Sequence, residues 1–152
     1  MRGLTRASRS VAERRHDQGL LDTSVVIELE NLDPESLPTE LAISAVTLAE
    51  LAAGPHATDD VEERARRQDR LQRTEATFNP LPFDDAAARA YGRTYAAVVA
   101  AGRKARGARV VDLFIAAIAL ANGLPLYTHN TDDFAHLGDL IEVVAPRRLA
   151  GA

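Results

Sequence analysis

The sequence predicts an α/β fold with a mostly parallel sheet of about five strands flanked by helices. Two observations lead to this expectation. From Asp17 onward, short apolar runs alternate with helical patterns, which is typical of parallel strands joined by covering helices. In addition, 152 residues with 46% apolar and 26% charged side chains suffice for one domain with its own core. We therefore expect a single α/β domain.

The expected elements follow from apolar periodicity and from turn residues such as those in "NLDPESLP" and "GLPL". Strands are expected near residues 19–23, 40–44, 79–83, 125–128 and 140–144. Helices are expected at about 24–30, 45–54, 59–76, 84–102 and 110–122, with a short one at 132–137. The segment 59–76 is so polar that it predicts a solvated helix or arm with few core residues.

Charge separates the first 16 residues from the rest of the chain. They contain five Arg and one Glu, a net charge of +4, whereas the whole chain carries −4. Residues 17–152 therefore carry −8. We assign residues 1–16 to a basic extension that is disordered or results from an overlong start, and residues 17–152 to the folded domain.

Composition excludes several classes of protein. The chain has no Cys, which excludes disulfide frameworks and thiolate metal sites and favours a cytoplasmic protein. The longest apolar run, from Val110 to Ala121, contains Asp112 and is too short to span a bilayer. No membrane association is expected.

Three apolar segments each contain a solitary acidic residue. Asp22 is the only charged residue between Asp17 and Glu28, Glu50 lies in "ISAVTLAELAAGP" and Asp112 in "RVVDLFIAAIALANGLPLY". An unpaired buried carboxylate is costly and tends to become protonated, so each acid needs a cation, a hydrogen-bond donor or water. Apart from Arg109, no Lys or Arg lies in these segments. A shared metal ion is therefore the simplest partner for all three acids.

The chemistry of these residues favours a hard cation. Oxygen ligands without Cys or paired His select Mg²⁺, with Mn²⁺ as the alternative. Asp22 is expected at the carboxyl edge of the sheet, where open α/β folds build their sites. Because such ions also bind phosphate oxygens, the pattern indicates phosphodiester hydrolysis by a metal-activated water. The hydroxyls of Thr23 and Ser24 are expected to hold Asp22 or a metal-bound water.

Taken together, the three motifs resemble the PIN domain, and specifically the VapC-type toxin ribonucleases of bacterial toxin–antitoxin pairs. The resemblance is carried by "LLDTSVVIELE", "ISAVTLAEL" and "RVVDLFIAAIALANGLPLYTHNTDDF", and it extends from about Gly19 to Pro146. It implies a PIN-like three-layer sandwich and a metal-dependent endoribonuclease. The implied acidic cluster is Asp22, Glu50 and Asp112, with Asp22 and Asp112 holding the metal. The implied partners are RNA, a cognate antitoxin protein and a second copy of the chain.

The last motif departs from the family pattern. The family often has a fourth acid two residues after a Thr, and here Thr128 is followed by Asn130 at that place. We favour Asp133 over Asp132 as the replacement, because many members with Asn at the earlier position keep an acid directly before the Phe. Thr128 and Asn130 are then expected to support the acids. The alternative is that Asp132 and Asp133 only stabilise the start of a short helix.

A basic segment, "GRKARGAR" at residues 102–109, directly precedes the third motif in an otherwise acidic body. Its basic residues are expected to attract the RNA backbone, although a plain solvated loop is the alternative. These residues are Arg103, Lys104, Arg106 and Arg109. Because the aromatic content is only 5%, recognition of RNA shape and phosphates is expected over base stacking.

Three other functions stay open. A receiver domain also has acids at strand ends, and Asp84 and Asp85 in "PFDDA" are similar to its phosphoacceptor, but the acidic pair after the first strand is missing. A phosphatase with an Asp nucleophile needs a second Asp where this chain has Ser24. A catalytically inactive PIN-like binding module has the same motifs. RNA cleavage measured with and without Mg²⁺ separates all of these.

Overall fold

The computed structural model describes residues 15–151, except the side chain of Ala108. Of the extension predicted at residues 1–16, residues 1–14 lie outside the described residues, whereas Arg15 and His16 are described. The strands of the sheet are all parallel, in the order β2-β1-β3-β4. Their bounds are β1 Gln18–Leu21, β2 Glu40–Ala42, β3 Leu126–Tyr127 and β4 Val143–Val144.

The helices lie within a few residues of the expected positions. The α-helices are α2 Thr23–Ile27, α3 Ala45–Ala53, α4 Val61–Thr77, α5 Asp85–Ala100 and α6 Ala108–Ala121. Residues 15–151 also form the 3₁₀ helices η1 Leu29–Asn31, η2 Pro34–Ser36, η3 Gly54–Ala57 and η4 Thr131–Leu137. Several begin at a residue whose side chain accepts a backbone N–H of the first turn, the usual N-cap contact. These caps are Asp22, Ser44, Asp60 and Asp84.

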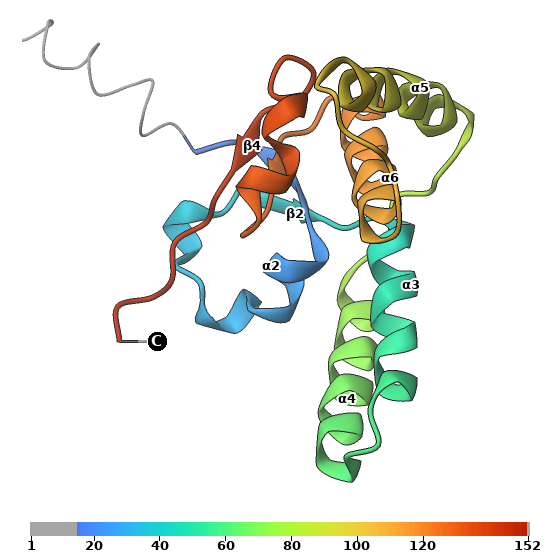
Figure 1. Cartoon of the computed structure of the whole chain (residues 1–152). Helices are drawn as coiled ribbons and strands as arrows, with labels where there is room; N and C mark the ends of the chain where they lie inside the picture. The colour runs from blue at the N-terminus through green and yellow to red at the C-terminus, as the bar shows by residue number, and fades with distance from the viewer. Residues whose placement is uncertain (1–14, 152) are drawn as a thin grey trace, which may run out of the picture.

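The sheet separates two hydrophobic clusters, which makes the domain a three-layer sandwich (Figure 1). Successive residues of a strand point to opposite faces. Accordingly, Leu20 and Leu126 pack with residues of α5, α6 and η4 on one face. Leu21 and Tyr127 pack with residues of α2 and α3 on the other. The predicted α/β sandwich is confirmed.

The predicted fifth strand at residues 79–83 is wrong. The segment forms one isolated parallel bridge, between Ser44 and Leu81, beside β2. Leu81 donates its N–H to the carbonyl of Ile43, but Pro80 and Pro82 on either side of it have no N–H to donate. Successive residues of a strand direct their N–H groups to opposite sides, so these prolines remove the donors on the side away from β2. The segment can therefore lie only at the edge of the sheet, where it forms its single bridge.

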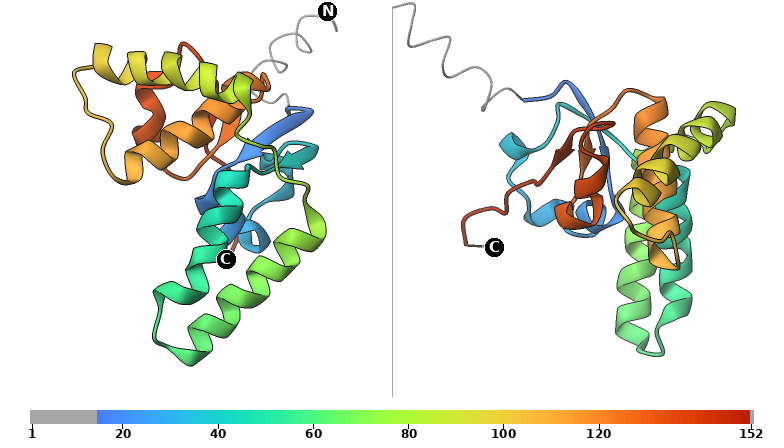
Figure 2. Two further views of the ribbon diagram at one scale, coloured as in Figure 1. Left: turned by 90° about the vertical axis from the view of Figure 1, so that its right-hand side faces the viewer. Right: turned by 45° about the horizontal axis from the view of Figure 1, so that its top comes forward.

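Helices α3 and α4 form a hairpin that projects away from the sheet (Figures 1 and 2). In α4 only Thr74 is buried, as expected of a solvated arm. The guanidinium of Arg67 donates to the carbonyl of Gly54 at 2.9 Å and thereby helps to fix the turn between the helices. Within the described residues, no helix combines the length and apolar character needed to cross a membrane.

Candidate active site

Asp22 lies at the carboxyl end of β1 and caps α2. Only 4% of this residue is exposed. Its carboxylate accepts hydrogen bonds from the N–H of Thr23 at 2.8 Å, the hydroxyl of Thr128 at 2.7 Å and the hydroxyl of Ser24 at 3.1 Å. All three donors are neutral, so the carboxylate is oriented by hydrogen bonds without being neutralised by a cation.

Glu50 reaches the same region from α3. Its Oε1 accepts a hydrogen bond from the hydroxyl of Thr23 at 2.7 Å. Because Thr23 also donates its N–H to Asp22, one residue links the two acids. Asp22 is buried, whereas Glu50 is exposed, so the pair extends from the interior to the surface.

Asp112, in the second turn of α6, and Asp133, in η4, complete the acidic group. Burial and, to a smaller extent, the negative charges of Asp22, Asp133 and Glu50 together raise the pKa of Asp112 to about 6, against the opposing effect of Arg109. Asp112 and Asp133 also line one small cavity, of about 10 Å³. The structure therefore gathers acids from four segments that are far apart in the sequence.

The acids have no cationic partner within the described part of the chain: none of its ion pairs includes Asp22, Glu50, Asp112 or Asp133. Nor do any three His, Asp or Glu side chains among residues 15–151 lie close enough to surround one ion. Their carboxylate and hydroxyl oxygens suit Mg²⁺ or Mn²⁺. Because Mg²⁺ keeps several waters and needs only one or two carboxylates, the donor set fits this class of ion.

The last motif contributes to the group through some of its residues only. Thr128 contacts Asp22 through its hydroxyl, as described above. The backbone N–H of Asn130 donates to the Thr128 hydroxyl at 3.0 Å, while its exposed side chain forms no hydrogen bond with the described residues. The negative charge of Asp133 raises the pKa of Asp112, and both residues line the same small cavity. Asp132 neither affects that pKa nor lines that cavity.

The four basic residues predicted to bind RNA are all exposed, in and next to the connection from α5 to α6. Arg109 also lines the cavity that contains Asp112 and Asp133. Arg103 lies close enough to His136 for its positive charge to lower the pKa of that imidazole. A positive segment thus borders the acidic group, where a polyanion needs it.

Two residues near the acids gave no sequence signal strong enough to single them out. Thr47 is a buried hydroxyl residue three positions before Glu50, and a polar residue on an apolar helix is the only cue. His136 lines the small cavity, and neither ring nitrogen has a partner among the described residues. Burial lowers the pKa of His136, and the charges of Arg103 and Arg109 lower it further.

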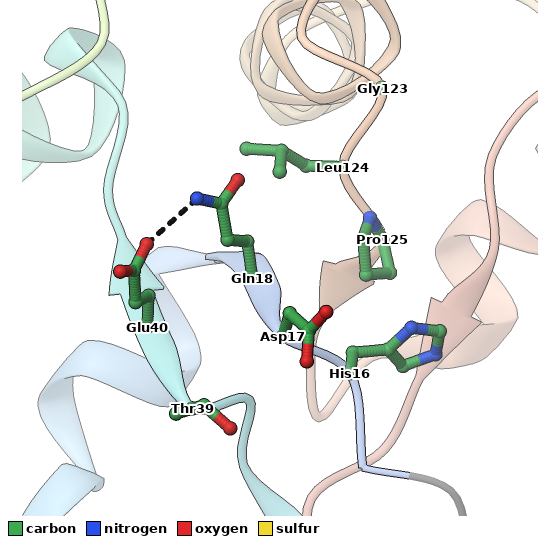
Figure 3. A pocket seen from close by; sticks show the side chains of 8 residues that line it. All are labelled: His16, Asp17, Gln18, Thr39, Glu40, Gly123, Leu124 and Pro125. Atoms are coloured by element: carbon green, nitrogen blue, oxygen red, sulfur yellow. Dashed lines mark hydrogen bonds between the residues drawn. The ribbon is translucent and has the colours of Figure 1, made fainter.

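A larger cavity, of about 480 Å³, lies elsewhere (Figure 3). It is at the amino end of β1, where Gln18 donates a hydrogen bond to Glu40 at 2.7 Å, and Asp22 is at the other end of the strand. Cavity size therefore does not mark the acidic group. The "PFDDA" acids do not resemble a phosphoacceptor either, because Asp84 accepts the N–H of Ala87 as an ordinary cap of α5.

Comparison with known proteins identifies the family of the chain. Residues 19–140 match the PIN domain. Ribonuclease VapC5 of Mycobacterium tuberculosis is 41% identical over 122 residues, which are 78% of this chain and 87% of that protein. The plasmid stability protein StbB of Pseudomonas syringae is 35% identical over 144 residues, 84% of this chain and 96% of that one.

Solved structures show the same relationship. A chain in the crystal structure of VapBC-5, from the VapBC family of toxin–antitoxin systems of M. tuberculosis, superposes with a TM-score of 0.73 and 39% identity. The match covers 86% of this chain and 98% of that one. VapBC-1 from nontypeable Haemophilus influenzae gives a TM-score of 0.64 at 26% identity, covering 84% and 97%. The chain therefore belongs to the PIN-domain family, and within it to the VapC type.

Proposed function

We propose that this chain is a Mg²⁺-dependent endoribonuclease and the toxin of a toxin–antitoxin pair. The observation that carries the proposal is that Asp22, Glu50 and Asp133 lie near enough to Asp112 to raise its pKa, while none of the four acids forms an ion pair among the described residues. The relatives named ribonucleases support an RNA substrate. An RNA substrate in turn implies a cytoplasmic location. Mn²⁺ would suit the same oxygen ligands.

Each acid has a distinct part in this proposal. Asp22 and Asp112 would hold the metal, which when bound supplies a water of lowered pKa and a positive charge for the phosphate. The hydroxyls of Ser24 and Thr128 keep the Asp22 carboxylate fixed. Glu50 and Asp133 are exposed, so they are placed to orient the attacking water and accept its proton. Water adds across one P–O bond, leaving a phosphate on one product and a hydroxyl on the other.

The proposal is tested by incubating the purified chain with RNA in millimolar Mg²⁺ and, separately, in chelator. Cleavage within the RNA in Mg²⁺ alone is the expected result. RNA binding without cleavage would instead indicate a catalytically inactive binding module. Covalent labelling by a small phosphoryl donor, again without cleavage, would indicate the receiver-type function.

We further propose that Arg103, Lys104 and Arg106 contact RNA phosphates. Replacing all three with Ala is expected to weaken RNA binding. The negative slope of log affinity against log salt concentration should become shallower by roughly 2, at about 0.7 per lost contact with a single strand. Fluorescence anisotropy over a salt series measures this slope. The matched control replaces Arg66, Arg70 and Arg73, which removes equal charge from the projecting helix α4 (Figure 1). Equal slopes for the two triple variants would count against the loop as the RNA contact.

The solved relatives described as toxin–antitoxin complexes support a protein partner for this chain. We propose that a cognate antitoxin binds the chain and blocks RNA cleavage. Co-expression with the cognate antitoxin, to be sought in the neighbouring reading frame, should yield a stable complex that does not cleave RNA. A complex that cleaves as fast as the free chain would contradict inhibition by that protein.

We also propose that the chain forms a homodimer through α5. Tyr95 and Val99 are 47% and 56% exposed and lie one helical turn apart, so they share a face. Tyr91 connects this face to Phe114, with the two ring centroids 5.0 Å apart. Exposed apolar surface of this kind marks an interface. Light scattering should give twice the chain mass for the wild type and the monomer mass for Tyr95→Glu. A monomeric wild type at micromolar concentration would contradict the dimer.

A further inference from the structure

Thr47 differs from the other helical threonines in what its hydroxyl contacts. The hydroxyls of Thr74, Thr77 and Thr94 donate to backbone carbonyls of their own preceding turns, at 2.8, 2.8 and 2.9 Å. This is the usual bond of a Thr within a helix. Thr47, 0% exposed in α3, forms no such bond within the described chain. Its Oγ1 instead lies 3.0 Å from the Oγ1 of Thr23, in another helix.

The direction of the hydrogen bonds follows from counting protons, because each hydroxyl has only one. The Oγ1 of Thr23 lies 2.7 Å from the carboxylate of Glu50, which only accepts, so Thr23 must donate there. The Thr47 hydroxyl must therefore donate to Thr23. The remaining contact of Thr47, 3.4 Å to the hydroxyl of Ser44, must then be donated by Ser44. The hydroxyls form one relay from Ser44 through Thr47 and Thr23 to Glu50.

The relay has a buried end and an exposed end. Ser44 and Thr47 are both 0% exposed, and the Ser44 hydroxyl is fixed because it accepts the N–H of Thr47 at 3.0 Å. Glu50, by contrast, is exposed, and a free Glu side chain samples many rotamers. Hydrogen bonds in such a chain polarise one another, so the buried hydroxyls strengthen the bond that reaches the carboxylate.

We propose that Thr47 is a positioning residue for the nuclease reaction: through the Thr23 hydroxyl it holds the Glu50 carboxylate toward the other acids. The proposal rests on the proposed function of the site. It assigns Thr47 no contact with RNA or metal. It also explains why a hydroxyl is buried at a position where the apolar face of α3 would otherwise favour Val or Leu.

The kinetic test compares Thr47→Val, which removes the donor, with Thr47→Ser, which keeps it. Thr47→Val is expected to lower kcat for RNA cleavage about tenfold, at the lower end of effects seen for residues that orient metal-site ligands, with KM unchanged. Thr47→Ser should stay within about twofold of the wild type. The matched control is Thr94→Val, which removes an equally buried hydroxyl from α5 and should leave kcat unchanged.

Thermal melts of all three variants separate positioning from stability. If Thr47→Val and Thr94→Val lose similar melting temperature and only the first loses kcat, the positioning role is supported. Equal kcat losses in the two Val variants, or a Thr47→Ser variant as slow as Thr47→Val, would overturn it.

A second measurement needs neither RNA cleavage nor a variant. In the NMR spectrum of the wild-type chain, the hydroxyl protons of Thr23 and Thr47 should exchange slowly with water, and the Thr23 proton should show a nuclear Overhauser effect to the Glu50 side chain. A Thr47 hydroxyl proton directed at a carbonyl of its own helix would overturn the relay. If the relay is observed but the wild type cleaves no RNA, the proposed function fails and the positioning role fails with it. If cleavage is observed without the relay, only the positioning role fails.

Discussion

Replacing Asp22 with Asn is expected to reduce Mg²⁺-dependent RNA cleavage by more than about 100-fold, beyond the range typical of residues that only orient metal ligands. An amide is neutral and binds a hard cation poorly. The substitution keeps the shape of the side chain and its capping oxygen, since Asn caps helices about as well as Asp. The loss should therefore appear in the rate of cleavage at saturating RNA, measured over a Mg²⁺ series.

The control for this substitution is Asp60→Asn, at the cap of α4. Asp60 accepts the N–H of Glu62 at 3.1 Å and is exposed, so the change removes one charge from another helix cap. Cleavage by Asp60→Asn should equal that of the wild type. An Asp22→Asn variant that cleaves at near wild-type rate would remove the basis for a metal at this position.

Asp112→Asn is expected to make the folded chain more stable in chelator at pH 7, by about 1 kcal/mol. The pKa of Asp112 is about 6 when folded against an ordinary value of 3.8. Asp112 ionises near pH 3.8 in the unfolded chain but only near pH 6 in the folded chain. The free energy of unfolding therefore falls as the pH rises between these two values, and the full loss is present above pH 6. Because the side chain is only half-buried, screening by solvent limits the destabilisation by ionised Asp112 to about 1 kcal/mol. Asn removes this penalty and loses no hydrogen bond within the described residues.

In Mg²⁺ the wild type should become more stable than Asp112→Asn, the reverse of the order expected in chelator. Binding to the folded state alone raises the melting temperature of the wild type, and the gain grows with Mg²⁺ concentration. Asp112→Asn should gain less. Thermal melts of both proteins, in chelator at pH 5 and pH 7 and in millimolar Mg²⁺ at pH 7, measure all of these effects. A clear loss of stability for Asp112→Asn in chelator, with no effect of Mg²⁺ on the wild type, would mean that the acid stabilises the fold and binds no ion.

The layers of the fold were predictable because burial leaves a periodic record in the sequence. The apolar run of β1 and the long apolar stretch of α6 have the periods of a buried strand and helix. The pairing of residues 79–83 was not predictable from hydrophobicity. Leu81 and Phe83 read as a buried strand, but the segment pairs only through the bridge at Leu81, and Pro80 and Pro82 leave no N–H donors on its other side.

The acids of the candidate site could be singled out from the sequence for a different reason. Asp22, Glu50 and Asp112 are each costly in an apolar segment, so their presence indicates a function that opposes stability. Thr47 carries no such signal, because a Thr in a helix usually bonds its own backbone. Only the placement of α2 beside α3 reveals that its hydroxyl faces Thr23.

Anomalous X-ray scattering from a crystal grown with Mn²⁺ tests whether these acids hold a divalent metal. Mn²⁺ is the probe because it suits the same oxygen ligands as Mg²⁺ and scatters anomalously. We expect an anomalous peak beside the carboxylates of Asp22 and Asp112, at about 2 Å from their oxygens, and no peak there in Asp22→Asn. Crystals with millimolar Mn²⁺ that show no peak among these acids, or the same peak in Asp22→Asn, would contradict it.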